Sequence, residues 1–66
     1  MKGFIEVPDL DTGERRLHAV SYIVAILPRG GRGGSMITTL SGGVFETSLS
    51  YDSVLVLLRD ATVEKR

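Results

Sequence analysis

The chain has 66 residues and no cysteine, and its eight basic and eight acidic side chains cancel. A chain of this length is expected to form one domain, and it is too short to carry a cofactor-binding domain of its own. The lack of cysteine excludes disulfides and thiolate metal sites. Zero net charge excludes a general electrostatic attraction to nucleic acid or to an anionic membrane.

The small size of the chain predicts self-association. A domain of about 60 residues buries only about 60% of the surface that its unfolded chain exposes, so its core is marginal. Small domains commonly gain stability from disulfides, from a metal or from association. No apolar run approaches the ~20 residues that span a bilayer, and the first residues lack the apolar stretch of a signal peptide. We therefore expect a cytoplasmic homo-oligomer without membrane contact.

The first half of the chain is predicted to form three short strands. Residues 4–7 are β-prone and stop at Pro8, which cannot donate to a ladder, and residues 9–13 have turn chemistry. Residues 15–18 resume in extended form, and residues 20–27 make the most apolar strand. Because residues 20–27 are apolar on both faces, this strand is expected to be central or to be covered by a partner.

The second half is predicted to form a glycine-rich loop, two strands and a helix. Residues 28–35 read Pro-Arg-Gly-Gly-Arg-Gly-Gly-Ser and are expected to form a mobile hairpin loop. Strands at 36–40 and 44–47 follow, joined by a tight turn, and a helix is expected at about 50–61. The predicted fold class is α+β, mainly β: a strongly bent antiparallel sheet or small open barrel of about five short strands with one C-terminal helix, in a single domain spanning residues 1–66.

The expected helix has more apolar residues than one face can bury. Ser50 precedes it as a candidate N-cap. Leu55 and Val56 lie off the main apolar stripe, so we predict that they form a subunit interface, with burial in a curved sheet as the alternative. The main stripe, with the spacing i, i+3, i+4, i+7, consists of Val54, Leu57, Leu58 and Ala61.

The sequence offers little material for catalysis or metal binding. The only histidine, His18, follows Arg15 and Arg16, and one imidazole without cysteine supplies too few ligands for a metal. The carboxylates after Asp9 faintly resemble a calcium loop, but the twelfth position is Val20 rather than an acid. No serine lies in a nucleophile elbow. We therefore predict a protein that is not an enzyme and that has no catalytic residue, metal site or cofactor.

The loop at 28–35 is the strongest candidate for a ligand site. It contains two consecutive Arg-Gly-Gly units, and arginine with glycine suits phosphate, because the guanidinium binds in a two-point manner and glycine lets backbone amides approach an anion. Residues 1–14 carry one basic and four acidic side chains, whereas residues 15–32 carry four arginines and no acid. The predicted anion-binding residues are Arg29, Arg32, Gly30, Gly31, Gly33, Gly34, Arg15 and Arg16. The alternative is a hairpin tip without function.

The order of features between residues 4 and 58 also resembles known families. The matching pieces are Ile5-Glu6-Val7, Leu17-His18, Ile23 with Ile26, Ile37 to Leu40, Gly42-Gly43 and Ser50-Tyr51-Asp52-Ser53-Val54. In this order they resemble the small flagellar and swarming motility proteins of the FlbD type, and they are similar to the latter half of LytTR-type domains. The Arg-Gly-Gly insertion departs from both patterns. The resemblance implies a bacterial or phage accessory protein with a regulatory or counter-defence role.

Two functions follow from these features. The first is a non-enzymatic, oligomeric binding module that holds an anionic ligand, either a nucleotide-like small molecule or nucleic acid, through its arginine-bearing loops. The alternative is a protein–protein interaction module that inhibits or scaffolds a partner protein. In that case the glycine-rich loop only links two strands.

Overall fold

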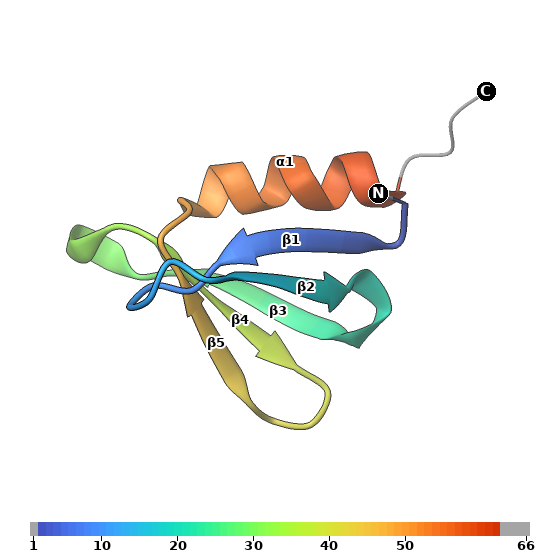
Figure 1. The fold of residues 1–66 in the computed structure, drawn as a ribbon, viewed down its shortest axis with the longest axis horizontal. Coiled ribbons are helices and arrows are strands. Elements are labelled where there is room, and N and C mark those ends of the chain that lie inside the picture. Colours follow the sequence, from blue (N-terminus) through green and yellow to red (C-terminus); the bar gives the residue numbers. More distant parts are fainter. Residues whose placement is uncertain (1, 63–66) are drawn as a thin grey trace.

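The computed structural model describes residues 2–62, apart from the side chain of Arg32. Five strands and two short 3-10 turns precede one helix, which lies along the first strand (Figure 1). The elements are β1 Phe4–Pro8, β2 Arg15–Ala19, η1 Val20–Tyr22, β3 Ile23–Pro28, η2 Gly30–Arg32, β4 Ser35–Thr39, β5 Val44–Thr47 and α1 Tyr51–Thr62.

The strands form two antiparallel sheets that meet at one corner. β1 pairs with β2, and β3, β4 and β5 form a three-stranded sheet in that order. The corner is an isolated bridge between Asp9 and Thr47, where the amide of Leu10 also donates to the carbonyl of Glu46 at 3.0 Å. The expected α+β fold with about five antiparallel strands and a C-terminal helix is confirmed.

The apolar segment 20–27 differs from its prediction in length and in place. Its first three residues form η1, and the strand itself begins at Ile23. In the described structure β3 pairs only with β4, so it lies at the edge of its sheet and not at its centre. A register shift between Ile23 and Ala25 bends the strand, and Val24 is left 59% exposed. Apolar content on both faces was therefore not a sign of a central strand.

The core lies between the two sheets and the helix. Its fully or almost fully buried members are Ile5, Val7, Ile37, Val54 and Ala61. The side chains packed around them are Val20, Ile23, Ile26, Phe45, Leu49, Leu57 and Leu58. Each of the helix residues of the predicted main stripe thus contributes to the core. None of the helices in the described part of the chain is long and apolar enough to span a membrane.

Hydrogen bonds at both ends hold α1 in place. The hydroxyl of Ser50 accepts a hydrogen bond from the amide of Ser53 at 3.1 Å, and the carbonyl of Ser50 accepts from the amide of Val54 at 3.0 Å. Ser50 is therefore the N-cap that the sequence predicted. At the other end the carbonyl of Ala61 accepts from the amide of Gly3 at 2.9 Å, which ties the last turn of the helix to the start of β1.

Candidate functional site

Two of the predicted anion-binding arginines, Arg15 and Arg16, have acidic partners. Arg15 Nε lies 3.5 Å from Glu6 Oε2, and Arg16 Nη2 lies 3.5 Å from Glu14 Oε1. The β1–β2 pairing causes this, because it places Glu6 opposite Leu17 and so diagonal to Arg15. Both pairs are exposed and contribute at most about 1 kcal/mol each to stability. They nevertheless cancel much of the positive charge that the count along the chain suggested.

The glycine-rich loop is closed on itself by Arg29. The Nη1 atom of Arg29 donates to the carbonyl of Gly33 at 2.9 Å, and its backbone amide donates to the carbonyl of Gly34 at 3.2 Å. Within the loop the amide of Gly33 donates to the carbonyl of Gly30 at 3.1 Å, which closes η2. Arg29 is half-buried, and its two hydrogen bonds hold the loop closed. The other N–H groups of its guanidinium are not used in these bonds.

The predicted arginines are not linked into one site. Among the described side chains, no hydrogen bond, ion pair or ring contact joins Arg15 or Arg16 to the glycine-rich loop. The side chain of Arg32 lies outside the described part of the chain. The glycines of the loop, Gly30, Gly31, Gly33 and Gly34, give it its shape. The anion site therefore stays a prediction.

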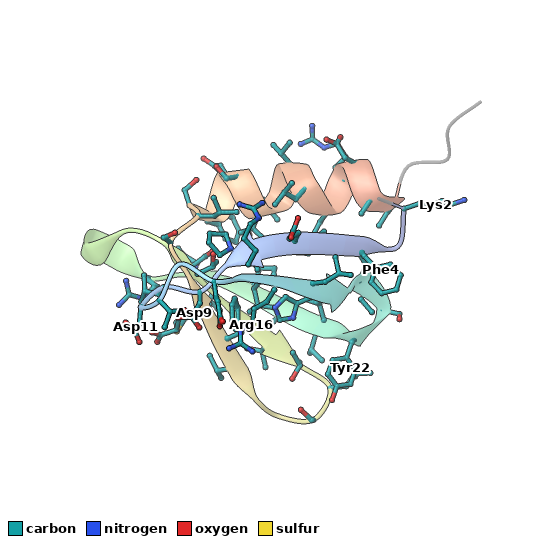
Figure 2. All side chains as sticks on the ribbon, viewed as in Figure 1. Lys2, Phe4, Asp9, Asp11, Arg16 and Tyr22 are labelled. Atoms are coloured by element: carbon teal, nitrogen blue, oxygen red, sulfur yellow. The ribbon has the colours of Figure 1, made fainter. Side chains whose placement is uncertain are left out.

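The acidic turn after β1 is a structural turn. Oδ1 of Asp9 accepts hydrogen bonds from the amides of Asp11 at 2.9 Å and Thr12 at 3.1 Å. These two amide donors hold the pKa of the Asp9 carboxyl below its usual value, because they favour its charged form. Figure 2 shows Asp9 and Asp11 at this exposed turn. The described residues contain no group of three or more side chains that could hold a metal ion.

His18 packs between the two sheets. Its ring lies against Phe45 of β5 with centroids 4.7 Å apart and the planes tilted by 55°. The guanidinium carbon of Arg16 lies 6.0 Å from the centroid of the same Phe45 ring. Nε2 of His18 is buried and has no hydrogen-bond partner among the residues that the structure describes. Burial, and then the charge of Arg16, lower the pKa of His18.

We expect His18 to make the stability of the fold depend on pH. The unfolded chain binds a proton at His18 near the ordinary imidazole pKa of about 6.5, whereas the folded chain binds it only at lower pH. Unfolding therefore takes up a proton in this range, and stability must fall as the pH drops from 7.5 to 5.5. Urea unfolding of the wild type and of His18→Gln across this range measures the effect. Parallel pH profiles for the two proteins would contradict the assignment.

The helix is flanked by two apolar grooves that sequence reasoning missed. One groove lies between α1 and β3, and its walls include Val24, Tyr51 and Leu55. The other lies between α1 and the outward face of β1 and β2. Val56 and Leu57 are among its walls, and so is the Glu6–Arg15 ion pair. It continues along the same two strands as a groove whose apolar walls are Phe4, Ile5, Leu17, Leu57 and Ala61.

Of the nine exposed large apolar side chains among the described residues, four lie elsewhere and five line these grooves: Phe4, Leu17, Val24, Tyr51 and Val56. Leu17 is 54% exposed, Val56 is 47% exposed and Phe4 is 41% exposed. The strand register places Phe4 opposite Ala19 and Leu17 opposite Glu6. Because side chains alternate with a period of two residues, Phe4 and Leu17 share the outer face of the β1–β2 pair. This alternation in the sequence was the signal that could have identified them. The predicted interface residues Leu55 and Val56 lie one on each groove.

No protein-family model matches the chain, and comparisons with curated proteins and with solved structures also return no match. The resemblance to flagellar motility proteins and to LytTR-type domains therefore stays a prediction. The function is therefore inferred from the surface of the fold.

Proposed function

We propose that this chain is a protein-interaction module whose working surface consists of α1 and its two flanking grooves. The observation that carries the proposal is the apolar character of this surface, with Leu17, Val24 and Val56 each about half exposed or more. Soluble monomers rarely expose contiguous apolar patches of more than a few hundred Å², and larger ones mark contact sites. A marginal core favours the same conclusion, because association buries further apolar surface.

The charged side chains favour this function over anion binding. Arg15 and Arg16 already face carboxylates, and Arg29 donates to a carbonyl of its own loop. An anion at these side chains competes with partners that are already in place. The anion-binding module remains the second candidate function, because no contact among the described residues brings its arginines together.

We expect Val56→Glu to abolish the association of the chain, because it places a charge in an interface that excludes water. The matched control is Val44→Glu, since Val44 is 60% exposed and lies on β5, after the turn that points away from α1 (Figure 1). Size exclusion coupled to light scattering at micromolar concentration gives the mass of each protein. A wild type with the mass of a single chain, or equal loss in both variants, would contradict the proposal.

A further inference from the structure

α1 has two faces with the same spacing on opposite sides. The face toward the core consists of Val54, Leu57, Leu58 and Ala61. Along the other side Asp52, Leu55, Val56 and Arg59 repeat the spacing i, i+3, i+4, i+7. At 100° per residue these four side chains lie within about a third of the circumference. Asp52, Val56 and Arg59 are exposed and Leu55 is half-buried.

This outer face, from here the 52–59 stripe, is complementary to itself. Asp52 and Arg59 are equally far from the midpoint between Leu55 and Val56. A two-fold axis through that midpoint therefore places each Asp52 opposite Arg59 of a second copy, while Leu55 and Val56 meet at the centre. Neither Asp52 nor Arg59 has an ion-pair partner among the described residues of its own chain, so both are available for this pairing.

We propose that the partner of this surface is a second copy of the same chain, bound with the two α1 helices antiparallel across a two-fold axis between Leu55 and Val56. The proposal rests on the function proposed above and gives it a partner and an orientation. A parallel arrangement in the same register places Asp52 against Asp52 and Arg59 against Arg59, and like charges in contact disfavour it. The antiparallel arrangement alone satisfies both charges of each helix.

The grooves are placed to take part in such a pair. Val56 lines the groove beside β1 and β2, and Leu55 lines the groove beside β3. Two helices of 12 residues are too short to bury the ~1,200 Å² of a stable interface by themselves. We therefore expect the groove walls, among them Tyr51 and Leu17, to add apolar area. The exposed charge pairs then set orientation more than affinity.

The decisive experiment reverses the charges one at a time and then mixes the variants. In the dimer of Asp52→Arg two introduced arginines face the two copies of Arg59, and in the dimer of Arg59→Asp two introduced aspartates face the two copies of Asp52. Each single variant should therefore associate at least tenfold more weakly than the wild type in sedimentation equilibrium. An equimolar mixture of the two should form a mixed dimer with about wild-type affinity, because every charge then meets its opposite.

The doubly reversed chain, Asp52→Arg with Arg59→Asp, separates this effect from helix stability. Both substitutions oppose the helix dipole, so a purely intramolecular effect makes the double variant the least stable of the set. Circular dichroism measures the helix content of each variant. The mixture contains the same two chains that are measured separately, so stronger association in the mixture cannot come from a change in their folding. Recovery of association in the double variant and in the mixture supports the proposal.

Two results overturn the inference and differ in what they leave standing. In the first, all the reversed variants associate as strongly as the wild type and show no preference for the mixed dimer. The interface then lies elsewhere, and the proposal of an interaction module still stands. In the second, the wild type has the mass of a single chain in sedimentation equilibrium. That result contradicts both the helix pairing and self-association.

Discussion

Ile37→Ala is expected to remove a large share of the free energy of unfolding of this domain. Ile37 is fully buried in β4, the middle strand of its sheet, and belongs to the same core cluster as Val7 and Val54. Truncation of a buried isoleucine to alanine costs about 2–5 kcal/mol, because the transfer energy is lost and a cavity remains. A domain of this size has only about 3–10 kcal/mol in total. Urea unfolding followed by circular dichroism measures the loss.

Two companions keep this prediction measurable. Ile37→Val removes one methyl group and should cost about 0.5–1.5 kcal/mol, which leaves a folded protein with a lower urea midpoint. Leu40→Ala removes an apolar side chain that is 66% exposed just after the same strand, and it should stay within about 0.5 kcal/mol of the wild type. Equal midpoints for Ile37→Val and the wild type would show that the core is not where the structure places it.

Gly34→Ala is expected to be the most damaging change in the glycine-rich loop. Gly34 has a φ of +79°, and a Cβ atom there comes within 2.5 Å of the backbone oxygen of Thr47. That oxygen has little freedom, because Thr47 is fully buried and pairs with both Ser35 and Asp9. Either the loop or the corner between the two sheets must therefore shift. We expect a loss greater than the ~1–2 kcal/mol of a left-handed conformation alone.

The loop contains its own controls for this prediction. Gly33 has a similar φ of +77°, but no described residue beyond its chain neighbours lies within 4 Å of an added Cβ, so Gly33→Ala should show only the conformational cost. Gly31 has no positive φ, and no described residue beyond its chain neighbours lies within 4 Å of an added Cβ, so Gly31→Ala should be close to neutral. Thermal or urea unfolding of the three variants should rank them Gly34, Gly33, Gly31 in order of decreasing loss. A different order would contradict the strain assigned to Gly34.

Local signals in the sequence were sufficient for the secondary structure. Pro8 ends its strand, Ser50 caps α1, and the stripe from Val54 to Ala61 faces the core. Each of these features depends on neighbours within about four residues, so the pattern that indicates it is complete in a short stretch of chain. The exception is the segment 20–27, whose apolar residues were assigned to one long strand that is central or covered by a partner. Only its length and its central position are wrong.

The candidate site depended on contacts between distant residues, and sequence reasoning found only part of it. Leu55 and Val56 were predicted as interface residues because an apolar surplus on a helix is visible locally, and each of them lines a groove. The grooves beside them were not, because their other walls come from β1, β2 and β3. The basic patch was expected from a charge count along the chain, and the count omitted the hairpin that folds Glu6 beside Arg15.

By itself, the sequence determined the elements of this protein: five short strands, a glycine-rich connection and a capped, amphipathic helix. These follow from periodicity, turn chemistry and capping, which act over a few residues. Only the tertiary structure decided that β3 is an edge strand, that two of the arginines face carboxylates, and that α1 lies between two apolar grooves. The physical reason is that strand order and register join residues far apart in the chain, and no local pattern encodes which partner each edge or charge will meet.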